Sequence, residues 1–301
     1  MYDVVIVGGG PAGLSAALIL GRCRRRVLVC DNGHPRNEAS QAMHGYLTRD
    51  GMPPREFLRI GRDELQPYDT VEIRDVTVTS AECVEGRFVT RLETGEEVRS
   101  RKLLIATGVR DKVPALEGIE SLYGRSVFHC PYCDGWEIRD EPIAIYGRGE
   151  PGYGLSLELT AWSRDLVLIT DGHSELDDRQ RRRLERLGIT VREERVARLE
   201  GSDGILQRIV FADGSAVDRR AMFFTTGQYQ QSALAIHLGC ELNEKGTVRT
   251  GRYESTHLPG LFVCGDASRA VQWVIVAASE GAEAAFAINT DLIKEDVAAY
   301  E

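Results

Sequence analysis

Two cysteines near the middle of the chain are the side chains best suited to chemistry. Cys130 and Cys133 stand in the segment Phe-His-Cys-Pro-Tyr-Cys-Asp-Gly, residues 128–135. Thiols separated by two residues can close a small ring and cycle between dithiol and disulfide. A zinc site would need four ligands, and the sequence adds only His129 to the pair, with no second C-x-x-C motif. We therefore predict a redox-active pair and no metal site; an inert buried pair is the other alternative.

The N-terminal residues predict a turn that binds a dinucleotide. A short β-branched strand over residues 3–7 runs into Gly-Gly-Gly-Pro-Ala-Gly and then into a helix, which puts G-x-G-x-x-G at a strand-to-helix turn. The helix N-terminus would face the phosphates with unpaired N–H groups. The second strand ends at Asp31, whose carboxylate can accept both ribose hydroxyls and would repel a 2′-phosphate. The residues predicted at this turn are Gly8, Gly10, Pro11, Ala12 and Gly13.

Two later segments favour FAD over NAD as the nucleotide at this turn. One strand ends in Thr107-Gly108, and another ends in Gly265-Asp266 before a long Ala-rich helix. Both resemble the second and third FAD signatures of flavoproteins with two dinucleotide domains. The resemblance implies that Asp266 bonds the ribityl chain. It also implies that the next helix points its N-terminus, at Gln272, toward the N1–C2=O edge of the flavin, where a helix dipole stabilises anionic reduced flavin. FAD is therefore the predicted cofactor.

A second glycine turn lies in the middle of the chain and predicts a second domain. Another strand meets Gly-Arg-Gly-Glu-Pro-Gly, and the strand after it leads to an aspartate. This order predicts an α/β fold with two Rossmann-like dinucleotide-binding domains, the second inserted in the first. We expect a discontinuous FAD domain over residues 1–110 and 245–301, and an insert over residues 111–244 that carries the cysteine pair. The second nucleotide site would consist of Gly147, Gly149, Gly152 and Asp171.

In this order, the motifs resemble the low-molecular-weight thioredoxin reductase family over essentially the whole chain. The resemblance implies that Cys133 faces the flavin C4a atom and that Cys130 is the interchange thiol that meets the substrate. It implies that Asp134 is the acid/base that handles the thiol proton, which suits a carboxyl beside a reactive thiol. It further implies a homodimer that acts on a thiol or disulfide of a small molecule or a protein, with thioredoxin as one candidate.

One departure from that family concerns the second nucleotide. The reductases follow the second strand of the NADPH domain with a His-Arg-Arg stretch and a further Arg, which hold the 2′-phosphate. Here the corresponding residues are Thr170-Asp171-Gly172, with Leu176 in place of the further Arg. Three alternatives stay open: NADH with Asp171 on its ribose, NADPH held by other arginines such as Arg148, or no NAD(P)H at all.

Similar changes occur in relatives that act as dithiol oxidases of the gliotoxin and holomycin type, which work through C-x-x-C, FAD and oxygen. Gly135-Trp136 and the stretch from His44 to Gly51 resemble that branch. His44 would be a base near the flavin or a structural histidine, and Tyr300 would stack on the flavin or belong to a frayed tail. We predict an enzyme that passes two electrons between FAD and the cysteine pair as a thioredoxin reductase-like protein. The alternatives are an NADPH-independent dithiol oxidase and an FAD-bound redox sensor.

Composition excludes several other classes of protein. The 301 residues suit about two domains, and 43% hydrophobic residues can fill ordinary cores. The net charge of -9 argues against a nucleic-acid partner held through phosphates. The sequence shows no basic leader and no apolar run of about 18 residues. Its seven cysteines are scattered apart from one pair, unlike a secreted disulfide framework. We expect a cytoplasmic protein with no membrane span.

Overall fold

The chain folds into two compact units, each built around a sheet whose central strands are parallel. The computed structural model describes residues 1–298. The first unit contains residues 1–38, 45–110 and 228 onward, and the second contains residues 39–44 and 111–227. The predicted α/β class with two Rossmann-like domains is confirmed: the central strands of both sheets run parallel, and antiparallel strands over residues 78–92 extend the first sheet.

The return from the second unit to the first lies earlier than we expected. Our prediction placed it at residue 245, whereas the contacts place it at residue 228. Leu234 and Cys240 share a hydrophobic core with Val78 of the first unit, so the segment from 228 to 244 belongs there. Three residues, Thr225-Thr226-Gly227, separate β15 from β16 at this crossing, and Gly227 has a φ of 86°. Gly246 resembles a linker in the sequence, but its N–H donates to the carbonyl of Asn243 in a local turn.

The first unit has a seven-stranded sheet with the order β3-β2-β1-β6-β5-β4, and β17 pairs with β6. The strands of this sheet are β1 (Tyr2–Val7), β2 (Val27–Asp31), β3 (Val71–Asp75), β4 (Val78–Val84), β5 (Arg87–Leu92), β6 (Glu97–Ile105) and β17 (Leu261–Val263). The helices are α1 (Pro11–Arg22), α2 (Pro54–Asp63), α6 (Leu234–His237) and α7 (Val274–Ala298). Two short strands pair near the chain crossings, β7 (Val109–Asp111) and β16 (Gln228–Gln230).

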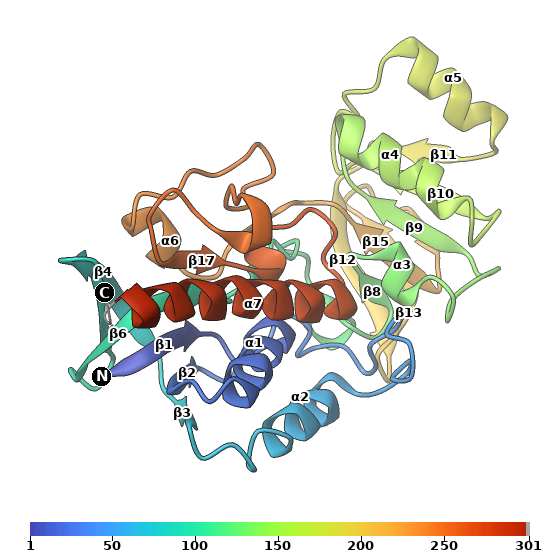
Figure 1. The fold of residues 1–301 in the computed structure, drawn as a ribbon. Coiled ribbons are helices and arrows are strands. Elements are labelled where there is room, and N and C mark those ends of the chain that lie inside the picture. The colour runs from blue at the N-terminus through green and yellow to red at the C-terminus, as the bar shows by residue number, and fades with distance from the viewer. Residues whose placement is uncertain (299–301) are drawn as a thin grey trace. The chain divides into compact units, whose positions relative to one another are not determined.

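Strand β1 is buried on both faces, which explains its unbroken β-branched sequence. Val4 and Ile6 face a core shared with α1 and α7, while Val5 and Val7 face a second core. In Figure 1, α7 (red) runs alongside α1. A Cβ on Gly281 would lie 2.0 Å from the Ala12 carbonyl oxygen, so only glycine permits this approach. The long C-terminal helix therefore braces the first turn of α1.

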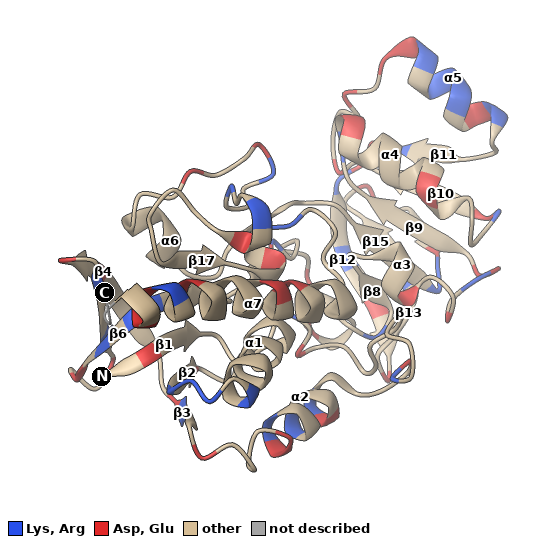
Figure 2. Ribbon diagram, viewed as in Figure 1, with Lys and Arg blue, Asp and Glu red and all other residues tan. Residues whose placement is uncertain are grey.

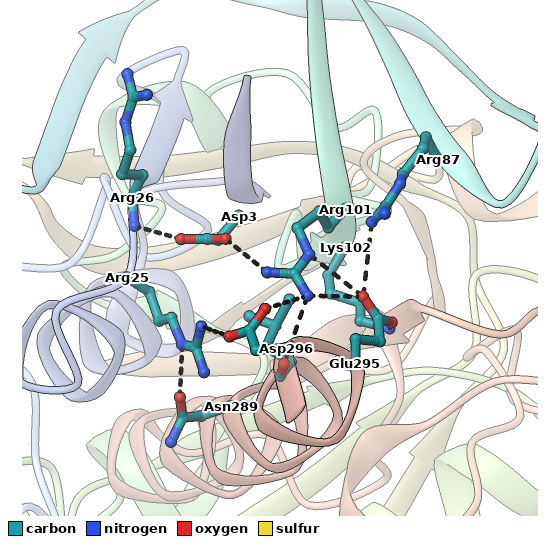
Figure 3. A network of polar contacts seen from close by, with 10 residues as sticks. Asp3, Arg25, Arg26, Arg87, Arg101, Lys102, Asn289, Glu295 and Asp296 are labelled. Atoms are coloured by element: carbon teal, nitrogen blue, oxygen red, sulfur yellow. Dashed lines mark hydrogen bonds and ion pairs between the residues drawn. The ribbon is translucent and has the colours of Figure 1, made fainter. Parts of the chain in front are cut away.

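The C-terminal part of α7 is fixed to the sheet by ion pairs. Arg101 of β6 contacts Asp3 at 3.1 Å, Glu295 at 2.9 Å and Asp296 at 2.7 Å. Figure 3 shows this network, in which the Arg101 guanidinium lies among three carboxylates. Networked charges hold position better than isolated surface pairs. Within residues 1–298, no helix is long and apolar enough to cross a bilayer.

The second unit contains a five-stranded sheet with the order β11-β10-β9-β15-β8 and a three-stranded sheet, β12-β13-β14. Its strands are β8 (Val127–Phe128), β9 (Ile143–Tyr146), β10 (Leu166–Ile169), β11 (Thr190–Arg192), β12 (Val196–Ser202), β13 (Ile205–Phe211), β14 (Ala216–Asp218) and β15 (Ala221–Phe224). Its helices are α3 (Pro131–Asp134), α4 (Gly149–Leu159) and α5 (Asp178–Arg186). Figure 2 shows α5 as a largely blue, basic helix. The β9-α4-β10 unit is the second Rossmann element of the chain.

Candidate functional site

The two cysteines of the C-x-x-C motif form a disulfide. Their Cα atoms are 5.3 Å apart, Cys130 has extended backbone, and Pro131 starts α3 where no N–H donor is needed. A Cβ on Gly135 would lie 3.0 Å from the ring of Trp162, so glycine lets the segment turn against that ring. Both cysteine residues are partly exposed. A substrate sulfur can therefore reach the pair.

Two exposed aromatic side chains lie close to the disulfide in sequence. Tyr132 lies between the two cysteines in sequence and is 60% exposed, and Trp136 is 65% exposed. The Tyr132 ring stands edge-on to Trp162 with 5.4 Å between centroids, and Arg139 lies 4.0 Å above the Trp136 ring. Exposed aromatic groups of this kind favour apolar contact with a ligand or partner. The surface beside the sulfur atoms suits a substrate with apolar groups.

Asp134 lies directly after the disulfide and carries a proton more readily than an ordinary aspartate. Burial raises the pKa of Asp134 to about 7, and the charge of Glu137 adds to the rise while His44 opposes it. His44 Nε2 lies 3.6 Å from Glu137 Oε1. A pKa near neutrality suits a group that both accepts and returns a proton. The structure thus brings the predicted residues Asp134 and His44 into one charged cluster of the second unit.

His129 forms part of a second polar cluster that sequence reasoning missed. Its Nε2 lies 3.5 Å from Asp111 Oδ2, and its Nδ1 lies 3.5 Å from the Tyr123 hydroxyl. The Asp111 side chain is only 7% exposed. A buried carboxylate at this distance orients the imidazole. The only signal in the sequence was the position of His129 next to Cys130, because Asp111 is distant along the chain.

The first glycine turn has the shape of a dinucleotide cradle. Gly8 has a φ of 110°, and a Cβ on Gly13 would lie 1.9 Å from the Gly8 carbonyl oxygen. No atom lies within 4 Å of a Cβ built on Gly10, so the space over the turn is open. The Oγ1 atom of Thr107 is buried and has no hydrogen-bond partner within residues 1–298. Open space, close helix packing and an unsatisfied hydroxyl together fit a bound FAD.

Other residues predicted at the flavin site converge around an arginine that we did not predict. Arg36 Nη1 donates to Asp266 Oδ2 at 2.8 Å and to Gln272 Oε1 at 2.6 Å. Asp31 ends β2 as expected, and its Oδ2 accepts from Arg62 at 2.5 Å. Gly265 adopts a φ of 71° at the turn beside Asp266. The sequence located the carboxylates but not the arginines. Arg36 lies in the loop after β2, 230 residues before Asp266, and Arg62 lies in α2.

Two buried carboxyl groups, those of Glu280 and Glu254, lie close to the turn at Gly265. Glu280 of α7 accepts from the Gly265 N–H at 2.8 Å, and Arg269 contacts both Glu280 and the fully buried Glu254. Burial and the charge of Glu254 raise the pKa of Glu280 to about 7. Burial also raises the pKa of the Cys264 thiol well above its usual range. Cys264 is therefore a core thiol and no second nucleophile.

The second glycine turn lies between β9 and α4, and polar groups of the same unit surround the carboxylate that follows β10. Gly147 and Gly152 pack closely, since a Cβ on Gly152 would lie 2.7 Å from the Gly147 carbonyl. The Asp171 carboxylate accepts from the Val196 N–H at 2.8 Å and from the Tyr146 hydroxyl at 3.1 Å. Leu176, which takes the place of a phosphate-binding Arg, is 8% exposed and packs in the core under α4 and α5. Two arginines also lie near this carboxylate: Arg148 Nη2 is 4.0 Å and Arg195 Nη1 is 3.8 Å from Asp171 Oδ2.

No group of three or more potential metal ligands gathers within residues 1–298. Two of the free cysteines, Cys23 and Cys83, are exposed, and the other three are buried. Tyr300, considered above as a flavin contact, lies outside the described residues.

Comparison with known proteins places the chain in a family. Residues 2–281 match the model of the family described as pyridine nucleotide-disulphide oxidoreductase. The chain is 30% identical over 310 residues to the thioredoxin reductase aclD of Aspergillus oryzae, an alignment that covers 99% of this chain and 98% of that protein. The structure of HlmI superposes with a TM-score of 0.95 at 37% identity, covering 99% of this chain and 95% of that one. The structure of an oxidoreductase from Agrobacterium tumefaciens superposes with a TM-score of 0.90 at 32% identity, covering 97% of this chain and 98% of that one.

The chain therefore belongs to the pyridine nucleotide-disulphide oxidoreductase family and has the thioredoxin reductase fold. It is an FAD-dependent enzyme that exchanges electrons with thiols and disulfides, as the sequence predicted.

Proposed function

We propose that the protein oxidises a dithiol substrate to a disulfide through Cys130 and Cys133, without NADPH. The observation that carries this proposal is the chemistry at the second nucleotide site. Asp171 and the buried Leu176 stand where a reductase needs cations for the 2′-phosphate. Electrons that do not enter from NADPH must enter from the thiol side. The resemblance of Gly135-Trp136 to dithiol oxidases supports the same direction.

The chain's own residues account for the thiol chemistry. A substrate thiolate attacks the Cys130 sulfur, the bond to Cys133 breaks, and Cys133 leaves as a thiolate. The second substrate thiolate then attacks the substrate's own sulfur in the mixed disulfide, the bond from that sulfur to Cys130 breaks, and Cys130 leaves as a thiolate. The substrate disulfide is released and the cysteine pair is left reduced. Asp134, with a pKa near 7, takes a proton released by the substrate thiols. His129, which precedes Cys130 in sequence and pairs with Asp111, would carry the other.

FAD, when bound, would supply a two-electron acceptor for the reduced pair and pass those electrons on to oxygen. Thr107, Asp266 and Gln272 are the residues we expect to hold it. The substrate is a small or protein-borne dithiol with apolar groups that contact Tyr132 and Trp136, each more than half exposed. We also propose a homodimeric, cytoplasmic enzyme, which sedimentation of the FAD-loaded protein and cell fractionation would test.

The proposal is tested by measuring which reaction the enzyme sustains in air. With dithiothreitol as a model dithiol, we expect oxygen uptake and the formation of one peroxide per disulfide. With NADPH and oxidised thioredoxin, we expect no nucleotide consumption above the rate of a protein-free control. Sustained NADPH oxidation coupled to thioredoxin reduction would overturn the proposal and establish a reductase.

A further inference from the structure

The segment between β10 and α5 folds back over the second glycine turn. The Gly149 N–H donates to the Ser174 carbonyl oxygen at 2.9 Å. A Cβ on Gly149 would lie 3.5 Å from the Glu175 carboxylate, so an acidic group covers the turn. In a dinucleotide site, amides at this position face the pyrophosphate, and a nearby carboxylate would repel it. Residues of the protein itself therefore lie over the second turn, where a nucleotide would bind.

Arg148 joins the glycine turn to the end of β10. Its Nε donates to the Thr170 carbonyl oxygen at 2.5 Å, and its Nη2 donates to the Asp171 carbonyl oxygen. The guanidinium also lies close to Gly172, in the loop after β10. A Cβ on Gly172 would lie 3.0 Å from Nη2. The end of the second strand is where a Rossmann domain holds the adenosine ribose. Arg148 thus spans the distance between the pyrophosphate position and the ribose position.

The covering segment is anchored and does not lie on the turn by chance. Ser174 is fully buried, and its N–H donates to Glu193 Oε1 at 3.0 Å. Arg181 of the basic helix α5 contacts the Ser174 hydroxyl at 2.5 Å and Glu193 at 2.6 Å. The bonds from Ser174 and Arg181 lower the pKa of Glu193 to about 2. The buried Leu176 holds the other end of the segment in the core.

The first glycine turn lacks such a cover. Within residues 1–298, no backbone oxygen accepts from the Gly10 N–H, and nothing approaches the Cβ position of Gly10. Gly10 keeps a φ of -74°, whereas Gly149 at the same place in the second motif has a φ of 53°. Two identical sequence patterns therefore have different backbone conformations.

We infer that Arg148 and the segment 170–176 form a latch that closes the second dinucleotide site and excludes pyridine nucleotides. The inference deepens the proposed function, because a closed site explains why electrons enter from thiols. It differs from the reading in which Arg148 binds the 2′-phosphate of NADPH. In the latch, the Arg148 guanidinium is held by the chain's own carbonyl groups, and its loss should expose the site. If Arg148 were a phosphate ligand, its loss should weaken binding.

The sign of the change in nucleotide affinity on Arg148→Ala tests the latch. Binding of NADH, NADPH and ADP-ribose to FAD-loaded protein would be measured by isothermal titration calorimetry, which needs no turnover. We expect NADH and ADP-ribose to bind the variant about tenfold more tightly than the wild type, because two hydrogen bonds no longer have to break. Glu193→Ala removes the acceptor of the Ser174 N–H and should also raise the affinity for NADH and ADP-ribose.

Matched controls make the result specific. Arg179→Ala removes an exposed arginine of the same unit and should leave nucleotide affinity unchanged. Arg148→Lys keeps the charge but loses the paired bonds, so it should open the site nearly as well as alanine. Tighter NADH binding in Arg148→Ala and Glu193→Ala supports the latch. Weaker NADPH binding in Arg148→Ala, unchanged binding in both variants, or tight binding by the wild type would overturn it.

The outcome is separable from that of the proposed function. If the variants gain nucleotide affinity but dithiols do not reduce the enzyme, the latch stands and dithiol oxidation fails. If dithiols reduce the enzyme but the variants gain no affinity, the proposed function stands and the latch fails.

Discussion

The two glycine turns of this chain carry the same sequence pattern and have different environments. At the first turn, Gly10 is open, Thr107 has a buried unsatisfied hydroxyl, and α7 braces the helix that follows. At the second turn, the Gly149 N–H and the Arg148 guanidinium are bonded to the segment after β10. The difference teaches that G-x-G-x-x-G specifies a strand-to-helix turn, whereas the following loop decides whether a ligand can reach it.

The largest expected effect concerns the cysteine pair. Its turnover should depend on FAD at the first glycine turn and on no nucleotide at the second. Cys130→Ser removes the sulfur that we assign to the substrate, and we expect dithiol turnover to fall at least about 1000-fold while FAD stays bound. Oxygen uptake and the flavin spectrum would be measured together. Cys83→Ser, at an exposed free cysteine, is the matched control and should keep full activity. Full turnover by Cys130→Ser would refute the assigned role.

The next effect tests the open turn. Gly10→Val places a branched side chain in empty space, where the backbone must approach the pyrophosphate. We expect FAD affinity to fall about 100-fold or more, with the melting temperature of the FAD-free protein nearly unchanged. Flavin content after gel filtration and thermal unfolding of the apoprotein would check this. A yellow, fully loaded variant would mean that the first turn is not the pyrophosphate site.

Asp134→Asn tests the proton-handling carboxyl in the second unit. We expect turnover to fall about 100-fold, since the carboxylate is the proton acceptor. In the wild type the rate should rise as Asp134 ionises, up to its pKa of about 7, and the variant should lose this rise. A pH–rate profile of both proteins would be compared. An unchanged profile would assign the proton to another group, with His129 the next candidate.

The same substitution has a predicted sign for stability. Because the folded pKa of Asp134 is raised from 3.8 to about 7, ionisation destabilises the fold progressively as pH rises from about 4 to 7. Asparagine removes this penalty, so its stabilisation should be about 2 kcal/mol larger at pH 8 than at pH 5. Urea unfolding at the two pH values measures it.

The smallest effect concerns the closed turn. Gly149→Ala puts a Cβ at ordinary contact distance from Glu175, but at a φ of 53° that favours glycine. We expect a loss of about 1 kcal/mol in unfolding free energy, with FAD content and dithiol turnover unchanged. Chemical denaturation and flavin content would be compared with those of Gly10→Val. Loss of FAD from Gly149→Ala would show that the two turns are not independent.

The sequence located the elements of the site better than their partners. Local patterns determined the glycine turns, the cysteine pair and the strand ends at Thr107 and Asp266, because each depends on neighbouring residues. Arg36 beside Asp266, and Asp111 beside His129, could not be predicted, since tertiary folding alone brings them together. The return crossing at residue 228 was also missed, although Gly227, with a φ of 86°, directly precedes it.

Asp171 shows a similar limit at the second turn. Its position after β10 suggested a ribose contact as one alternative, and the structure adds two partners of its carboxylate, Val196 and Tyr146, that the sequence did not predict. A carboxylate at the end of a Rossmann strand has a role that depends on which donors the fold brings to it. Residue spacing within one βαβ unit does not contain that information.

The most direct test of the account is the source of electrons for the flavin. FAD-loaded protein would be mixed anaerobically with dithiothreitol, NADPH or NADH, and the flavin absorption band followed in time. We predict that dithiothreitol bleaches the band and that admitting air restores it, while neither nucleotide bleaches it on the time scale of turnover. Rapid bleaching by NADPH would contradict the account.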